Sequence, residues 1–200
     1  MNYTGPKVKL SRKIGIALTP KAMKYMERRP YPPGVHGKGG RKRRISDYKR
    51  QLFEKQKLKL QYNVSERQMV RNYRKASRLH GSTPELLVQL LEQRLDALVL
   101  RAGFARSIYA ARQYVVHGHI LVDGKKVNIP AYKVKSGQVI SVKPGSRRLD
   151  CFHNALKTAP PYDYIDVNKP GLEFRFLRIP ARDEIPVICD AILVVEFYSR

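Results

Sequence analysis

Residues 94–130 read RLDALVLRAGFARSIYAARQYVVHGHILVDGKKVNIP, and this stretch decides the fold of the chain. Ser107 is typical of a helix N-cap and Gly118 of the residue that ends a helix, so we predict a helix over Ile108–His117. Beyond it the apolar period changes to two, and Asp123-Gly124 favours the type I′ turn of a β-hairpin. The stretch therefore predicts a helix followed by a hairpin.

One helix is predicted to begin before this stretch and to run into it, and three strands are predicted after it. Residues 82–85 (STPE) predict a helix start, because proline is favoured in the first turn and glutamate complements the positive end of the helix dipole. The apolar pattern continues to Leu100 without a break, so we expect one helix that stops near Gly103. Runs typical of strands follow at 139–142, 173–177 and 191–195.

Two further helices are predicted upstream. Ser46 is a plausible N-cap, and the apolar stripe that follows begins with Tyr48, Leu52 and Phe53. The outer face of this helix is expected to be basic, with Lys49, Arg50, Lys55, Lys57 and Lys59. Residues 65–68 (SERQ) fit a capping box, and Met69, Tyr73 and Ala76 then follow at helical spacing as candidate core residues. The outer face of this second helix is also basic: Arg67, Arg71, Arg74, Lys75 and Arg78.

Residues 1–45 are predicted to be irregular, because glycine and proline are frequent there. A solid cationic run, residues 41–44 (RKRR), ends the segment. Such a run alone is often a solvated tail, but Tyr31, His36 and Tyr48 lie around it and can stack on bases or sugars. We expect a segment of this kind to order against RNA.

The net charge indicates a polyanionic partner. The 200 residues include 40 Lys and Arg against 16 Asp and Glu, which gives a net charge of +24. Residues 1–80 hold 23 of these cations against 4 acidic residues, so they have a net charge of +19, whereas residues 81–200 have +5. A folded chain with this charge repels itself unless a dense polyanion compensates it. The phosphate-binding surface should be richest in the first two-fifths of the chain.

The sequence offers little sign of catalysis, metal binding or membrane insertion. It contains no nucleotide-binding glycine loop, metalloprotease motif or nucleophile elbow. Cys151 and Cys189 suit reduced thiols better than a disulfide framework or a zinc site, and His117 with His119 makes metal chelation only the minor alternative. No apolar run reaches the roughly 20 residues of a spanning helix, and we expect no signal peptide.

Cationic and imidazole side chains cluster around the predicted helix and hairpin. They are Arg106, Arg112, Gln113, His117, His119, Lys125 and Lys126. Guanidinium forks and helix N-termini suit phosphate, although an ordinary charged face would show the same composition. A DNA-binding basic protein is one alternative that composition alone permits.

The order of these motifs resembles the S-four RNA-binding motif. The matching segments are residues 94–96 (RLD), Arg101, 104–107 (FARS), 111–113 (ARQ), 117–120 (HGHI), 122–124 (VDG) and 129–130 (IP). RNA-modifying enzymes and a tRNA synthetase also contain this motif, so the flanking residues decide between the families. Residues 28–37 (RRPYPPGVHG), 46–48 (SDY), 54–57 (EKQK) and 195–200 (VEFYSR) resemble the family of small-subunit ribosomal protein four. An RNA-modifying enzyme would need a separate catalytic domain, for which no segment of adequate length is left.

The resemblance implies an α+β fold. It comprises a mainly helical domain and an inserted S-four-type RNA-binding domain, in which two helices pack on a small, mostly antiparallel sheet. We divide the chain into a basic N-terminal extension (1–45), a helical domain (46–91) to which the tail (185–200) returns, and the RNA-binding domain with the following strands (92–184).

The resemblance also implies partners and a role. Members of the family bind the 5′ domain of small-subunit (16S-type) rRNA, nucleate subunit assembly and contribute to translational fidelity where mRNA enters the subunit, beside ribosomal proteins three and five. In some bacteria the protein also represses its own operon. We expect a cytoplasmic ribosome, with an organellar ribosome as the alternative, and no membrane, cofactor or enzymatic activity.

Two departures from the family pattern qualify these expectations. Some members have four cysteines and a zinc ion near the N-terminus, whereas this chain has no cysteine there, so we expect no metal. Ile108 stands where an arginine often follows the capping residue, which removes one possible phosphate contact.

We predict that twenty residues contact RNA and that none is catalytic. They are Arg28, Arg29, Tyr31, His36, Arg41, Lys42, Arg43, Arg44, Lys49, Arg50, Lys55, Lys57, Arg71, Arg106, Arg112, Gln113, His117, His119, Lys125 and Lys126.

Overall fold

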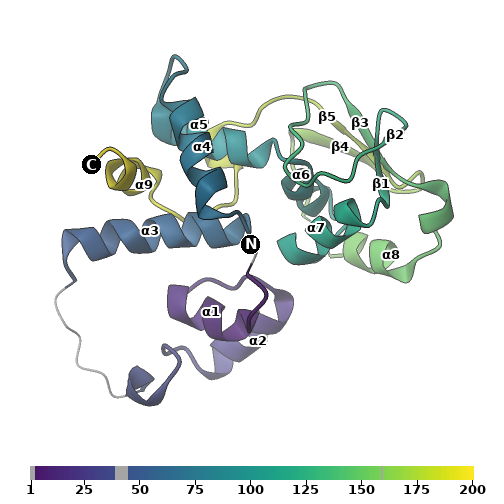
Figure 1. Ribbon diagram of the computed structural model, residues 1–200. Helices are drawn as coiled ribbons and strands as arrows, with labels where there is room; N and C mark the ends of the chain where they lie inside the picture. Colours follow the sequence, from purple (N-terminus) through teal and green to yellow (C-terminus); the bar gives the residue numbers. More distant parts are fainter. Residues whose placement is uncertain (1–2, 39–44, 159) are drawn as a thin grey trace. The chain divides into compact units, whose positions relative to one another are not determined.

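The computed structural model describes residues 3–38, 45–158 and 160–200. The chain forms two compact units: unit 1 contains residues 1–88 and 186–200, and unit 2 contains residues 89–185 (Figure 1). The chain therefore leaves unit 1 once, builds unit 2 from a continuous segment, and returns.

Unit 2 is an α+β unit built on an antiparallel sheet. Its elements are α6 (Leu95–Arg101), α7 (Ile108–Val116), β1 (Ile120–Val122), β2 (Lys125–Lys126), β3 (Val139–Val142), the 3-10 turn η2 (Pro144–Ser146), α8 (Asp150–Leu156), β4 (Ile165–Asn168), β5 (Glu173–Phe176) and the 3-10 turn η3 (Arg182–Glu184). The strands pair in the order β2-β1-β3-β5-β4, and each neighbouring pair is antiparallel. The fold class expected from the sequence is confirmed.

Alternate residues of the central strands form the core of unit 2. Ile120, Ile140 and Phe174 are buried with residues of α6, α7 and α8, whereas Ser141 and Arg175 on the other face are more exposed. Phe174 contacts Phe104 edge to face, with ring centroids 5.3 Å apart. Burial of each such side chain stabilises the unit by about 1.5–3 kcal/mol, and it requires the helices to cover this face of the sheet.

The predicted hairpin turn is confirmed. Asp123 and Gly124 have φ angles of 47° and 76°, the left-handed conformation that a type I′ turn requires at both central positions. The Asp123 carboxylate accepts hydrogen bonds from Gln138 Nε2 at 2.6 Å and Val139 N at 2.9 Å. This carboxylate therefore anchors the turn to β3.

The single helix predicted to run from residue 83 and to stop near Gly103 is wrong, because the chain breaks between α5 (Thr83–Glu92) and α6. Arg94 has extended dihedrals and pairs with Lys133, and Leu95 N donates to Tyr132 O at 2.9 Å. These backbone bonds to a distant segment replace helical ones. Apolar spacing could not reveal the break, because it continues through both helices.

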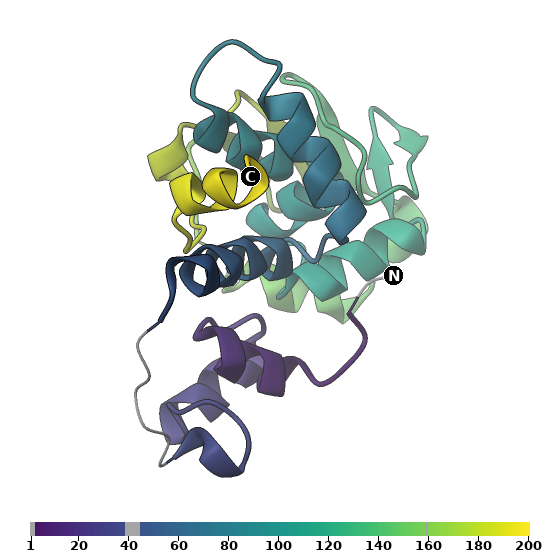
Figure 2. The ribbon, with the colours of Figure 1, turned by 60° about the vertical axis from the view of Figure 1, so that its left-hand side comes forward.

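Unit 1 is helical in the residues that the structure describes. Its elements are α1 (Lys7–Ile14), α2 (Pro20–Arg28), the 3-10 turn η1 (Val35–Gly37), α3 (Asp47–Gln61), α4 (Glu66–Ala76) and α9 (Ala191–Tyr198). Ser46 caps α3, and Ser65 with Gln68 forms a capping box on α4, as the sequence predicts. In both ribbon views α9 packs beside α3, so a helix from the end of the chain completes unit 1 (Figures 1 and 2).

The prediction that residues 1–45 are irregular is wrong for α1 and α2. Thr19 Oγ1 accepts a hydrogen bond from Ala22 N at 3.2 Å, and Pro20 occupies the first helical position, so both residues start α2. Gly15 ends α1 with a φ angle of 74°. Frequent proline and glycine predict an irregular segment. Here Gly15 and Pro20 instead mark the end of one helix and the start of the next.

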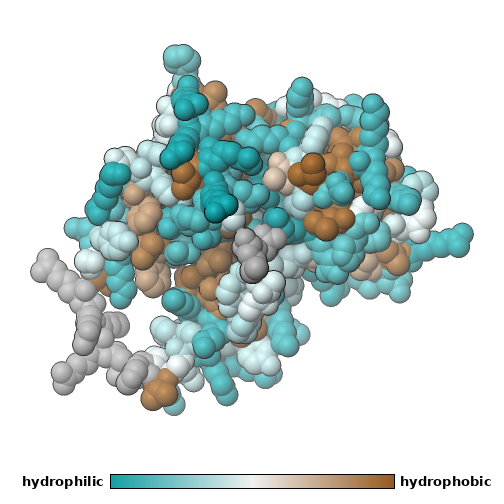
Figure 3. Space-filling model, viewed as in Figure 1, coloured by the Kyte–Doolittle hydropathy of each residue, from teal (hydrophilic) through white to brown (hydrophobic). Residues whose placement is uncertain are grey.

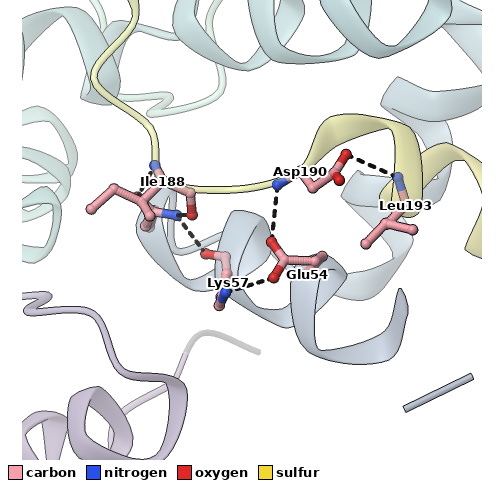
Figure 4. A network of polar contacts seen from close by, with 6 residues as sticks. Glu54, Lys57, Ile188, Asp190 and Leu193 are labelled. Carbon is pink, nitrogen blue, oxygen red and sulfur yellow. Dashed lines mark hydrogen bonds and ion pairs between the residues drawn. The ribbon is translucent and has the colours of Figure 1, made fainter. Parts of the chain in front are cut away.

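The strand predicted at residues 191–195 is also wrong, because this run begins α9. The Asp190 carboxylate accepts hydrogen bonds from Ile192 N and Leu193 N, which satisfies free donors at the helix start. Figure 4 shows Asp190 N donating to the Glu54 carboxylate of α3, at 2.9 Å, and Lys57 pairing with the same carboxylate at 2.6 Å. Tertiary contacts with α3 override the strand preference of the β-branched residues.

Lys55 does not lie on the basic outer face of α3 as predicted. Gln51, Lys55, Leu58 and Tyr62 are buried, and their spacing of four, three and four residues defines the inner stripe of the helix. The Lys55 ammonium lies 3.1 Å from the Glu66 carboxylate of α4. Because two of the four inner residues are polar, hydrophobic spacing assigns Lys55 to the wrong face.

Glu66 links three elements of unit 1. Its carboxylate pairs with Lys55 and with Lys59 at 2.9 Å, and it accepts a hydrogen bond from the Tyr198 hydroxyl of α9 at 2.7 Å. Burial opposes ionisation, but the hydrogen bonds from Lys59, Tyr198 and Lys55 lower the pKa of Glu66 to about 2. The ionised carboxylate therefore contributes to the packing of α9.

We expect the stability of unit 1 to fall as the pH drops from about 4.5 to about 2. The folded-state pKa of Glu66 lies below its ordinary value of 4.5, so its contribution is complete above pH 4.5 and is lost as the pH falls through the folded pKa. Thermal melts of the wild type and Glu66→Gln across this range measure the effect, and the difference in melting temperature should shrink with acidification. Tyr198→Phe, which removes one donor, should lie between the two, and a constant difference would contradict the assignment.

Candidate nucleic-acid interface

In unit 2, α7 and the hairpin bring His117, His119 and Lys126 together. Ser107 Oγ accepts a hydrogen bond from Ala110 N at 3.3 Å and starts α7, and Gly118, with a φ angle of 72°, ends it. The Lys126 side chain crosses Gly118 so closely that a Cβ atom there would collide with it. The His117 and His119 ring centroids lie 6.0 Å apart. We call these three residues with Ser146 the motif surface.

His119 joins the hairpin to η2. Its Nδ1 atom lies 2.8 Å from Ser146 Oγ, and its ring meets Tyr114 and Phe152 edge to face, with centroids 6.3 Å and 6.4 Å away. The imidazole is half-buried and fixed in orientation, whereas His117 is exposed. Fixed imidazoles can donate to phosphate or stack on a base without losing rotamer freedom on binding.

Three other exposed candidates of unit 2 lie on or beside α7 and the hairpin. Gln113 lies four residues before His117 and therefore shares its face of α7. Lys125 adjoins Lys126 on β2. Arg106 lies at the opposite end of α7, where its Nη2 atom donates to Asn154 O at 3.2 Å. The structure thus groups Gln113 with the motif surface, places Lys125 next to Lys126 but on the other face of the strand, and places Arg106 apart.

Arg112 faces inward, toward a buried carboxylate. Its Nη1 atom lies 3.4 Å from Asp96 Oδ2, and 17 % of its side chain is exposed. Asp96 is fully buried, and Arg94 donates two hydrogen bonds to it, at 2.9 and 2.8 Å. Burial raises the pKa of the Asp96 carboxyl and lowers that of the Arg112 guanidinium, while the charges of the two groups oppose both shifts. Arg112 therefore helps to neutralise the buried Asp96 carboxylate, and only a small part of its side chain reaches solvent.

Cations outside the predicted RNA-binding set lie next to the motif surface. They are Lys143, Arg147 and Arg148, all exposed, in and around η2. Arg147 Nε donates to Val142 O at 3.2 Å, and Arg147 O lies 2.8 Å from His153 Nε2. Three cations within six residues directly after a predicted strand could have marked this segment as an RNA-binding candidate. The segment has no periodic pattern, so it was not assigned to a helix or strand.

In unit 1, Tyr31 is held by Arg12, which is not among the residues predicted to bind RNA. Arg12 donates to Tyr31 O at 3.1 and 2.9 Å, and its guanidinium lies 5.0 Å from the centre of the Tyr31 ring. Arg28 and Arg29 are exposed. Arg12 fixes the turn that follows α2, so it positions Tyr31.

The remaining candidates of unit 1 divide by exposure. Lys49, Arg50 and Arg71 are exposed, and Lys57 is paired with Glu54. Only 8 % of the Lys55 side chain is exposed. The His36 side chain and residues 41–44 lie outside the described residues. In the space-filling view hydrophilic side chains cover much of the visible surface of both units (Figure 3).

Residues 3–38, 45–158 and 160–200 contain no group of three His, Cys, Asp or Glu side chains arranged to hold a metal ion. Among the same residues, every helix is too short or too polar to cross a membrane.

Comparison with known proteins identifies the family. Residues 2–92 match the family described as Ribosomal protein S4/S9 N-terminal domain, and residues 93–140 match the S4 domain. The small ribosomal subunit protein uS4 of Streptomyces avermitilis is 55 % identical over 204 residues, covering 100 % of this chain and 99 % of that protein. The chain belongs to the uS4 family. Its uS4 relatives in Micrococcus luteus and Thermobifida fusca are 53 % and 50 % identical, over 96 % and 100 % of this chain and 95 % and 100 % of theirs.

Membership of the uS4 family makes the chain a structural protein of the small ribosomal subunit with an RNA-binding S4 domain, and not an enzyme. The S4 match contains α6, α7 and the hairpin, and it therefore includes His117, His119 and Lys126 of the motif surface, while Ser146 follows the matched residues. The resemblance that the sequence analysis found is thus confirmed over both domains of the family.

Asp96→Ala should destabilise unit 2 by about 3–5 kcal/mol, because it leaves the Arg94 guanidinium buried without its counter-charge. Urea unfolding followed by circular dichroism measures the loss. Asp166→Ala, at an exposed position of β4, is the matched control and should change the free energy of unfolding by less than about 0.5 kcal/mol. Equal losses in the two variants would show that the buried pair adds nothing to stability.

Proposed function

We propose that this uS4 family member is a primary rRNA-binding protein, which binds the 5′ domain of small-subunit rRNA and nucleates subunit assembly. The observation that carries the proposal is the motif surface, where two imidazoles and a lysine are held around Gly118 within the S4 domain. Exposed Lys143, Arg147 and Arg148 extend its positive charge. A surface of this kind suits the phosphates and 2′-hydroxyls of folded RNA.

Unit 1 supplies a second contact region in this proposal. Residues 1–80, with a net charge of +19, all belong to unit 1, and Arg28, Arg29, Lys49, Arg50 and Arg71 are exposed. Two charged surfaces on one chain can bind two helices of a junction at once, so specificity comes from RNA shape and from the distance between the helices. Residues 41–44 add four cations to this region.

We further propose that the protein lies beside ribosomal proteins three and five where mRNA enters the subunit, and that it contributes there to translational fidelity. Kinship with uS4 proteins supports this placement. The ribosome that contains it would be cytoplasmic.

Binding to naked small-subunit rRNA tests the main proposal. A salt series with an unrelated RNA of equal length as competitor should show a preference of orders of magnitude for the cognate RNA, and footprinting should protect one multi-helix junction of the 5′ domain. Equal affinities with equal salt slopes would show that the charge acts without specificity and would overturn the proposal.

Lys125→Ala combined with Lys126→Ala should weaken rRNA binding and reduce the slope of log affinity against log salt by roughly 1 for each lysine that contacts a phosphate. Filter binding across a salt series measures the slope. Lys169→Ala, in the exposed turn between β4 and β5, is the control and should leave the slope unchanged. If the double variant keeps the wild-type slope, the hairpin does not contact phosphate.

A further inference from the structure

Asp123-Gly124 is the one Asp-Gly pair in the chain, and the sequence contains no Asn-Gly pair. When glycine follows aspartate, the glycine nitrogen can attack the aspartate side chain with unusual ease, because glycine has no side chain to block the approach. Both residues are exposed at the tip of the hairpin, so water reaches them. The turn that leads to Lys126 of the motif surface therefore has the sequence most prone to this reaction.

The reaction is an intramolecular condensation that needs no partner except water. The Gly124 nitrogen bonds to the carboxyl carbon of protonated Asp123, a carbon–oxygen bond of that carboxyl group breaks, and the oxygen leaves as water with the carboxyl and amide hydrogens. Water then opens the cyclic imide at either of its carbonyl groups. Opening at the backbone carbonyl gives isoaspartate, in which the main chain runs through the former side chain and is longer by its β-carbon.

The folded hairpin holds the Asp123 carboxylate through both of its oxygens. Oδ1 accepts a hydrogen bond from Val139 N at 2.9 Å, and Oδ2 accepts one from Gln138 Nε2 at 2.6 Å. We call these two donors the carboxylate clamp. Asp123 N also donates to Val139 O at 2.8 Å, so the backbone of the residue is tied to the same strand. To turn its carboxyl carbon onto the Gly124 nitrogen, Asp123 must release these hydrogen bonds, and bonds to a charged group are the stronger kind.

Gln138 is itself held by its neighbours in the sheet. Its Oε1 atom accepts a hydrogen bond from Lys135 N at 2.9 Å, so both ends of its side-chain amide are bonded. Its backbone oxygen accepts a hydrogen bond from Phe176 N of β5 at 3.1 Å. The carboxylate clamp is therefore a product of the folded sheet of unit 2, and it is lost when that sheet unfolds.

We propose that Asp123 is a site of isoaspartate formation, and that the carboxylate clamp protects it while unit 2 is folded. Isoaspartate lengthens the two-residue link between β1 and β2 and moves the carboxylate, so Lys126 loses its fixed place across Gly118. The modification thus marks chains in which the hairpin has opened. Its effect on RNA binding rests on the proposed function.

Incubation of the full chain in warm neutral buffer measures the rate of the reaction. Trypsin releases residues 113–125, in which Asp123 is the only acidic residue, and chromatography with electron-transfer fragmentation distinguishes aspartate from isoaspartate in this peptide. Gln138→Ala should raise the rate of isoaspartate formation about 10-fold, because Val139 N alone then holds the carboxylate. Ser136→Ala, at an exposed position nearby, is the matched control and should keep the wild-type rate. Equal rates in the two variants overturn the proposal.

A urea series on the wild type separates the carboxylate clamp from a general loss of fold in Gln138→Ala. Circular dichroism gives the unfolded fraction, and the rate of isoaspartate formation at Asp123 should rise in proportion to it. This series decides the matter alone if Gln138→Ala does not fold. Equal rates in the folded and the unfolded wild type show that the hairpin gives no protection, and they overturn the proposal.

Filter binding tests the consequence for RNA. Wild-type protein that has been partly converted by incubation is mixed with limiting cognate rRNA, and residues 113–125 are analysed in the retained and the free protein. Isoaspartate should be depleted in the retained protein, whereas an equal share in both overturns the link between the turn and RNA binding. If the fresh protein shows no preference for cognate rRNA, the proposed function fails, while the rates measured without RNA still decide whether the carboxylate clamp protects Asp123.

Discussion

Repulsion among forty lysine and arginine side chains is the constraint under which this chain folds. Several of its few carboxylates are used inside the units. Asp96 and Glu92 are fully buried in unit 2 and pair with arginines, and Glu66 holds two lysines and a tyrosine in unit 1. The Tyr164 hydroxyl donates to Glu92 at 3.0 Å, and burial beside that carboxylate raises the pKa of Tyr164. With these acids turned inward, much of the positive charge of each unit faces solvent.

Local sequence signals were sufficient where the hydrogen-bond partner lies only a few residues away in the sequence. Ser46, Ser65 and Ser107 cap their own helices, and Asp123-Gly124 makes its own turn, so each feature could be predicted from residues a few positions apart. These features included the helix and hairpin that form the motif surface.

Features that depend on distant contacts could not be predicted in this way. The extended conformation of Arg94 requires the segment around Lys133, and α9 is stabilised by α3. Lysine is positively charged and commonly exposed, so residue type predicts that Lys55 binds phosphate. The structure instead places its ammonium beside Glu66 and the Phe197 and Tyr198 rings of α9. A basic residue can thus be held by internal contacts instead of facing solvent, and residue type alone does not distinguish the two positions.

The interrupted course of unit 1 has a consequence for biosynthesis. A nascent chain emerges from its N-terminus, and domains generally fold as units while synthesis proceeds. All of unit 2 is translated before residues 186–200, so its sheet can close while α3 still lacks α9. The Lys55 ammonium then has Glu66 but not the Phe197 and Tyr198 rings, and the inner face of α3 is uncovered. The order of translation thus allows the S4 domain to fold before the helical unit is complete.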